Sequence, residues 1–313
     1  MIICLAHSAF LQSEEMPEQQ DNSIEERNFT ISFFTTYPIF EIGIEGIKNG
    51  EPYGNEISYA SNPPLTTGLS FEYKGLGISV LKSFENIKNE KKYGKTKSIE
   101  EQLFYYSRHW GIDIYHQNYE GLYLKSAASA LDSEKIRPDI KVDNIGFSGY
   151  YSLFDKFSLA SAFANEPVSE SSGSPLVYLS ANSFKISAGY SLVPQSIKYI
   201  YYNFPEYTGG RYSNISTGGG VAGVYKFKKN KSLFVSGAVL LGLGYMSIED
   251  STKNGSTSFS AAIKASAGYN NGIFHAILKF TFYYNSTLET GNKTDFNAYC
   301  VPTMFEFTSG YSF

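Results

Sequence analysis

Apolar and polar side chains alternate along most of the chain after Arg27, in short segments separated by clusters of Gly, Asn, Asp, Ser and Pro. A period of two places successive side chains on opposite faces of a β-strand, so this pattern predicts an all-β fold. The last segment shows the alternation most clearly. One of its faces carries Phe305, Phe307, Tyr311 and the terminal Phe313, and the other carries Glu306 and Thr308.

From these segments we predict about 14 antiparallel strands closed into a transmembrane β-barrel. Many of the segments approach the roughly 9–11 residues that a tilted strand needs to cross a bilayer. The predicted strands are 28–36, 65–73, 76–84, 98–107, 111–125, 142–152, 157–164, 175–190, 196–204, 215–227, 232–247, 258–269, 273–285 and 300–313.

Tight turns and long polar connections alternate between the predicted strands. Lys74-Gly75 and Asn270-Asn271-Gly272 are tight, whereas residues 37–64, 126–141 and 165–174 are long. Outer-membrane barrels have short periplasmic turns and longer external loops, and this alternation is what they require. It holds only if residues 196–204 form a strand, and a 12-stranded barrel is the alternative.

A soluble β-sandwich alternates in the same way, with its apolar face turned toward a protein core. Long strands, tyrosines near strand ends and a terminal aromatic residue favour the membrane barrel, with lipid outside and a polar lumen. No run of about 18 apolar residues occurs in the sequence, so a helical span is not expected. The net charge is −4, so the chain does not have the basic surface that nucleic-acid-binding proteins need. This excludes nucleic acid as a partner.

Residues 1–9 are predicted to be the remnant of a signal peptide, since a short apolar stretch precedes the small-x-small pattern Ala6-His7-Ser8. The basic region that normally opens such a signal is missing, so we expect the true start upstream. Residues 10–27 are predicted to be a polar linker, which leaves residues 28–313 for the barrel. Cys4 and Cys300 lack the spacing of a metal or redox motif, and we expect no metal and no cofactor.

The alternation also predicts which ionisable side chains face the lumen. They are Glu72, Asp113, Lys185, Lys264, His275, Lys279 and Glu306. In an open barrel such residues tune the selectivity of a channel, and in a filled barrel they form a paired network that closes it. The neighbouring pair Glu100 and Glu101 is interpreted as exposed charge, because it lacks the spacing of a metal-binding loop.

Several stretches of the sequence carry a resemblance to a known family. They are residues 62–79, 92–97, 102–106, 111–115, 137–140 and 144–151, which include Asn62-Pro63-Pro64, Lys92-Tyr93-Gly94-Lys95-Thr96-Lys97 and Arg137-Pro138-Asp139-Ile140. Together they resemble the uncharacterised family DUF4421, whose members look like outer-membrane barrel proteins. The resemblance spans roughly residues 60–313 and implies the fold and the location. It supplies no catalytic or binding residues.

The sequence therefore predicts a bacterial outer-membrane barrel that is not an enzyme and acts as a passive channel, a small-solute transporter or a structural surface protein. One alternative is a lipid-modifying enzyme based on His275, which needs a serine and an orienting group within reach. The other is a soluble β-sandwich or lipocalin-like binding protein. The expected partners are outer-membrane lipid, a small solute and the barrel-assembly machinery. A terminal strand with Phe307, Tyr311 and Phe313 on one face resembles the signal read by that machinery.

Overall fold

The structure is a computed structural model that describes residues 29–48, 51–86, 89–127, 135–201, 205–249, 256–287 and 296–313. The predicted signal remnant and polar linker lie outside these residues. Within the described ranges, no helix is long and apolar enough to cross a membrane.

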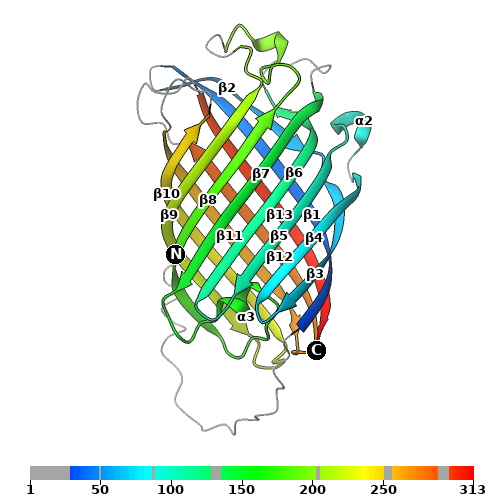
Figure 1. Cartoon of the computed structure of the whole chain (residues 1–313), viewed down its shortest axis with the longest axis vertical. Helices are drawn as coiled ribbons and strands as arrows, with labels where there is room; N and C mark the ends of the chain where they lie inside the picture. The colour runs from blue at the N-terminus through cyan, green and yellow to red at the C-terminus, as the bar shows by residue number, and fades with distance from the viewer. Residues whose placement is uncertain are drawn as a thin grey trace.

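The described chain forms one antiparallel sheet of thirteen strands, which closes into a barrel whose strands are tilted relative to its axis (Figure 1). The strands are β1 (Phe29–Lys48), β2 (Glu51–Ser61), β3 (Pro64–Tyr73), β4 (Leu76–Asn86), β5 (Lys97–Tyr106), β6 (Trp110–Ser126), β7 (Ile136–Ser152), β8 (Ser172–Ser187), β9 (Gly209–Lys226), β10 (Leu233–Ile248), β11 (Ser256–Asn270), β12 (Phe274–Thr287) and β13 (Phe296–Ser312). The helical elements are α2 (Glu90–Tyr93), α3 (Leu159–Phe163) and the 3₁₀ helix η3 (Gln195–Ile197).

The barrel closes because one edge of β1 pairs with β13 along almost its whole length. The other edge of β1 is shared: its first half pairs with β3, and its second half pairs with β2. β2 and β3 run in the same direction, one after the other, along this edge of β1. Together they therefore take the place of one strand in the ring, and the thirteen strands fill twelve places around the barrel. An even number is typical of bacterial outer-membrane barrels, and twelve is the predicted alternative.

The wall branches where β2 passes into β3. Above this point β2 pairs directly with β6, and below it the β4–β5 hairpin is inserted between β3 and β6. Three hydrogen bonds hold the branch: Asn62 N to Thr96 Oγ1 (2.8 Å), Asn62 Nδ2 to the Gly94 carbonyl (2.6 Å), and Thr96 Oγ1 to the Gly121 carbonyl (2.6 Å). Gly121 has a φ of +84°, and a Cβ there would lie 2.3 Å from the Lys95 carbonyl oxygen, so this crossing requires glycine.

Two of the predicted strands are wrong. Residues 157–164 contain α3 with Ser158 as its N-cap, and residues 196–204 begin with the end of η3 and continue as turns as far as they are described. Both segments are apolar because they fill the barrel interior, where Phe157, Leu159 and Ile197 are fully buried. Because residues 157–164 are not a strand, β8 runs in the direction opposite to the predicted one. Residues 196–204 are not a strand either, so β9 and the strands after it again run in the predicted directions. The later tight turns therefore lie at the predicted end, while the connection at 165–174 lies at the lower end instead of outside.

Residues 37–64, predicted to be a long external loop, mostly belong to the wall as the second half of β1 and as β2. Pro38 interrupts the strand pattern in the sequence. It lies between Thr36, the last residue of β1 registered with β3, and Glu41, the first registered with β2. A residue without an N–H is tolerated at such a break between two partner strands.

The outer face of the lower and middle barrel is apolar. Leu241, Leu278 and Phe305 are about half exposed, whereas the inward-facing Ser258 and Ser260 are almost completely buried. Aromatic side chains gather at the lower ends of the strands, among them Tyr73, Trp110 and Tyr311. A closed ring satisfies its own backbone groups, and an apolar exterior with an aromatic girdle meets lipid. The chain is a transmembrane β-barrel of the kind found in bacterial outer membranes.

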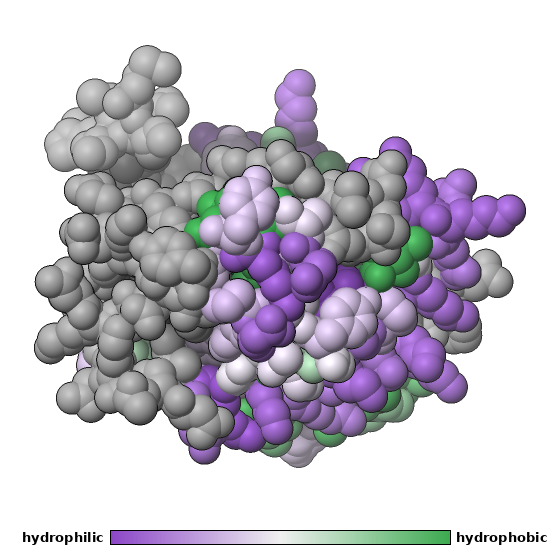
Figure 2. Space-filling view, turned by 90° about the horizontal axis from the view of Figure 1, so that it is seen from above, coloured by the Kyte–Doolittle hydropathy of each residue, from purple (hydrophilic) through white to green (hydrophobic). Residues whose placement is uncertain are grey.

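At the upper end the polarity of the two faces is inverted. Phe184, Ile186 and Tyr212 point inward and are buried, while Lys185 and Arg211 face outward. Figure 2 shows hydrophilic side chains gathered over this end of the molecule. The upper end therefore has the pattern of a water-soluble barrel, which indicates that it extends beyond the membrane. The first and last strands and the tight turns meet at the lower end, and in outer-membrane barrels the short turns face the periplasm.

Candidate functional site in the barrel lumen

The upper lumen is filled by the connection between β8 and β9, which we call the upper plug (residues 188–201 and 205–208). Leu192, Val193, Ile197 and Tyr201 of this segment are almost completely buried. They pack against apolar side chains that the wall turns inward, including Phe40, Ile57, Tyr119, Leu122, Ile140, Phe184, Tyr212 and Met246. Such packing excludes water from this part of the lumen.

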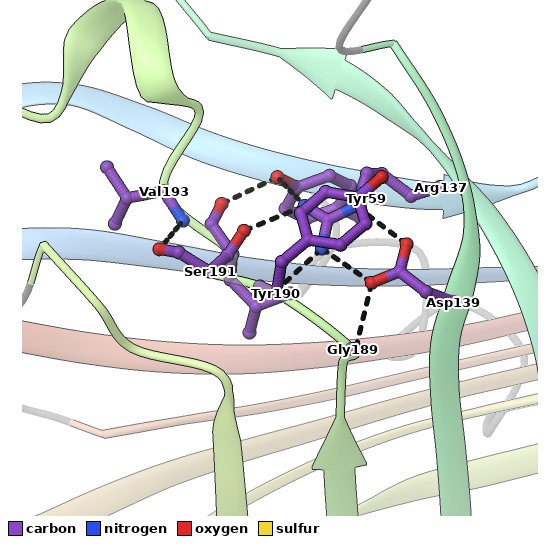
Figure 3. Close-up of polar contacts among 8 residues, drawn as sticks. Tyr59, Arg137, Asp139, Gly189, Tyr190, Ser191 and Val193 are labelled. Atoms are coloured by element: carbon purple, nitrogen blue, oxygen red, sulfur yellow. Dashed lines mark hydrogen bonds and ion pairs between the residues drawn. The ribbon is translucent and has the colours of Figure 1, made fainter.

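Arg137 of β7 fastens the upper plug to the wall (Figure 3). Its Nε and Nη2 donate to the two carboxylate oxygens of Asp139, at 2.9 and 2.8 Å. Its Nη1 donates to the Ser191 carbonyl and its Nη2 to the Tyr190 carbonyl, both at 2.9 Å. The Tyr190 ring stacks on the guanidinium at 3.9 Å. A planar, forked cation is suited to such a site, because it donates in several directions at once.

Further hydrogen bonds surround this clamp. The Tyr59 hydroxyl on β2 donates to the Leu192 carbonyl (2.6 Å), and Gly189 N donates to Asp139 Oδ2 (2.9 Å). Tyr207 contacts the Tyr212 hydroxyl, and burial raises the pKa of Tyr207 to about 12, so its hydroxyl stays neutral. The upper plug is thus held by a buried charge as well as by apolar packing.

The lower lumen is filled by α3 and its flanking residues, which we call the lower plug (residues 157–168). Phe157, Leu159, Ala160 and Ala162 pack against Phe104, Tyr150, Leu176 and Phe234 of the wall. Ser236 Oγ on β10 donates to the Ala162 carbonyl (2.7 Å), and Asn270 Nδ2 on β11 donates to the Asn165 carbonyl (2.8 Å). Figure 1 places α3 at the lower end of the barrel.

Asp113 and Lys264 form a buried ion pair across the lumen, with 2.6 Å between Oδ2 and Nζ. Asp113 also accepts hydrogen bonds from the hydroxyls of Tyr106 (2.7 Å) and Tyr150 (3.0 Å). The Lys264 ammonium lies 4.7 Å from the centre of the Tyr150 ring. Both charges are buried, and each is therefore compensated by the other.

A cavity of about 130 Å³ remains beside β4 and β5, bordered by α3. Its polar lining includes Glu100, Gln102, Asn165, Lys264, Lys279 and Glu306. Lys279 Nζ lies 3.3 Å from Glu306 Oε1, and the Tyr119 hydroxyl donates to Glu100 (2.7 Å). Close to this lining, Asn165 Nδ2 donates to the buried carboxylate of Glu72 (3.0 Å).

Six of the seven predicted lumen residues point inward and pair with one another or with neutral groups. Asp113 meets Lys264, Lys279 meets Glu306, Glu72 meets Asn165, and His275 Nε2 lies 3.1 Å from Ser32 Oγ. Lys185 does not belong to this set. Lys185 faces outward and is paired in register with Asp143 on β7 and Arg211 on β9. Its neighbours Phe184 and Ile186 point into the apolar interior of the upper barrel, so Lys185 must point the other way.

The sequence interpretation missed Glu100 and Arg137 as lumen residues. The sequence interpretation places both Glu100 and Glu101 on the exposed surface, yet the alternation of β5 turns Glu100 inward and Glu101 outward. The strand pattern carried that signal. Arg137 precedes the apolar stretch of β7, and nothing in the sequence pattern shows that a segment some fifty residues later folds back onto it. Among the described residues, no group of three or more His, Cys, Asp or Glu side chains is arranged to hold a metal ion.

A family model described as a domain of unknown function, DUF4421, matches residues 23–313. No curated protein matches the chain. Among solved structures, the outer membrane protease OmpT from Escherichia coli is similar at 8% identity and a TM-score of 0.43, over 96% of this chain and 99% of that chain. The toluene transporter TodX of Pseudomonas putida is similar at 9% identity and a TM-score of 0.31, over 93% and 91% of the two chains.

Proposed function

The chain belongs to the DUF4421 family, which is defined only as a domain of unknown function. We propose a role for it from the segments and side chains that fill its lumen. The protein is a closed outer-membrane barrel that presents its upper end at the cell surface as a structural protein, and it is not an open diffusion channel.

The filled lumen is the observation that carries this proposal. Conduction needs a continuous path for water and solute. In the described residues the upper plug and the lower plug occupy the two ends of the lumen, and the Asp113–Lys264 pair lies between opposite walls. Of the charges that would tune selectivity in an open barrel, Asp113 is paired with Lys264 and Lys279 with Glu306.

The position of His275 supports a lipid-modifying enzyme less well than the filled lumen supports a closed barrel. His275 and Ser32 lie within hydrogen-bond distance, as a serine nucleophile and its base would. Both residues are about 1% exposed and face the lumen, whereas lipid tails lie against the outer face. A Cβ on Gly310 would lie 2.7 Å from both His275 Cε1 and Ser32 Oγ, so the pair is tightly enclosed.

Purified protein inserted into planar lipid bilayers is expected to give no conductance steps above background, because both plugs block the lumen. Insertion is verified in parallel by reconstituting the same preparation into liposomes and measuring its resistance to protease. Regular single-channel steps from inserted wild-type protein would contradict the closed-barrel assignment.

A Tyr199→Cys variant, whose position in the upper plug is 76% exposed, is expected to react with a membrane-impermeant maleimide on intact cells. A matched Lys229→Cys variant, in the tight turn between β9 and β10, is expected to react only after the outer membrane is opened. Cys300 is buried and should contribute little background. The reverse labelling pattern would invert the proposed orientation.

A further inference from the structure

The cavity beside β4 and β5 has more carboxylates around it than cations to compensate them. Asp113 is paired with Lys264, and Glu306 with Lys279. Glu72 and Glu100 are about 95% buried, and in the part of the chain that the structure describes neither forms an ion pair. Their hydrogen-bond donors are neutral, an amide and a phenol. A buried carboxylate without a counter-ion tends to keep its proton, and a cation placed beside it would stabilise the ionised form instead.

Asn165 gives a second, independent indication of a ligand. It lines the cavity, is only 7% exposed, and its Oδ1 has no hydrogen-bond partner. Its Nδ2 is engaged by Glu72, which fixes the amide so that the oxygen is left free. Buried polar atoms normally have a partner, so this oxygen is suited to accept a hydrogen bond from an N–H group in the cavity.

Aromatic rings complete the lining. Phe34, Phe104, Tyr106, Phe163 and Tyr283 all border the cavity. The faces of such rings attract cations, as the neighbouring Lys264 ammonium demonstrates by lying 5.4 Å from the Phe163 ring centre. A hydrophobic cavity of about 150 Å³ can hold benzene, so the 130 Å³ here suits a ligand of about six non-hydrogen atoms.

We infer that this cavity binds a small organic ammonium ion, whose N–H groups are held by the polar lining that includes Glu100 and Asn165 and whose carbon atoms lie against the aromatic rings. The site goes beyond the closed-barrel role, since a barrel can be closed to ions with or without an occupied cavity. An inorganic cation would satisfy Glu100 but would gain nothing from the apolar part of the lining.

Binding of n-butylammonium to the full-length protein in detergent micelles tests the inference, with 1-butanol as the neutral analogue and KCl at equal concentration as the inorganic cation. Saturation-transfer NMR or calorimetry should detect saturable binding of n-butylammonium, and at least tenfold weaker binding of 1-butanol. Glu100→Gln should weaken n-butylammonium binding at least tenfold. Glu120→Gln, on the outer face of β6, should leave it unchanged within twofold.

A cavity-filling variant, Ser79→Met, retains the wall charges and should also abolish binding, since Ser79 lines the cavity. Far-ultraviolet circular dichroism establishes that each variant is folded. The inference is overturned if n-butylammonium does not bind saturably, if 1-butanol binds equally well, or if folded Glu100→Gln and Ser79→Met proteins bind like wild type. Complete displacement by KCl at equal concentration would overturn the organic character of the ligand. None of these outcomes depends on whether the barrel conducts.

Discussion

Replacing Arg137 with Met is expected to release the upper plug from the barrel wall at a cost of about 3–5 kcal/mol, the usual effect of breaking a buried ion pair from one side. The substitution removes the donors to the Tyr190 and Ser191 carbonyls. It also leaves Asp139, whose side chain is 17% exposed, without its cation. The methionine keeps much of the side-chain volume, so the loss reflects charge and hydrogen bonds more than a cavity.

Hydrogen exchange measured by mass spectrometry locates this effect. The amides of Gly189 and Leu192 donate to Asp139 and to the Tyr207 carbonyl, and their protection should fall strongly in the variant. Protection in β10 to β12, which form a distant part of the wall, should change little. Lys198→Met is the matched control, because it removes a surface pair with Glu206 from the same segment and should cost less than about 1 kcal/mol. Unchanged protection of the upper plug in the Arg137 variant would show that the clamp is dispensable.

Much of the barrel wall is predictable from local sequence, because lipid and lumen impose opposite polarity on successive residues. Ile263 and Phe307 are exposed on the outer face, while their neighbours Lys264 and Glu306 are turned into the lumen, as the alternation predicts. The rule fails where the surroundings change. Above the membrane the interior is apolar and the exterior is polar, so the predicted inward direction of the Lys185 side chain is wrong and it points outward.

Segments that fill the lumen are harder to recognise from sequence. An apolar stretch such as the one containing Leu159 has the composition of a lipid-facing strand, and only the closed ring shows that the space inside is available to it. The pairs inside the lumen are also invisible locally. Asp113 and Lys264 are 151 residues apart, and their contact depends on the register of the whole ring. The sequence therefore predicts which residues face inward, and the strand count and register decide which of them meet.

Removing the charge of Asp113 is expected to destabilise the barrel by about 3–5 kcal/mol, since Lys264 then remains buried without a counter-charge. Asp113→Asn preserves the shape of the side chain, so the loss measures charge compensation. Urea unfolding in phospholipid vesicles, followed through the fluorescence of the single tryptophan, Trp110, reports the free energy of unfolding. Lys185→Met, on the outer face of β8, should change this free energy by no more than about 0.5 kcal/mol.

The double variant Asp113→Asn/Lys264→Met separates the ion pair from the remaining packing. With both charges removed no buried ion is left uncompensated, and Met can occupy the space beside the Tyr106 and Tyr150 rings where the Lys264 ammonium lies. The double variant should therefore lose less stability than the two single variants together, with a coupling of about 2–3 kcal/mol. Strictly additive losses would mean that Asp113 and Lys264 act independently. The lumen would then be held closed by the aromatic packing and by the two plugs alone.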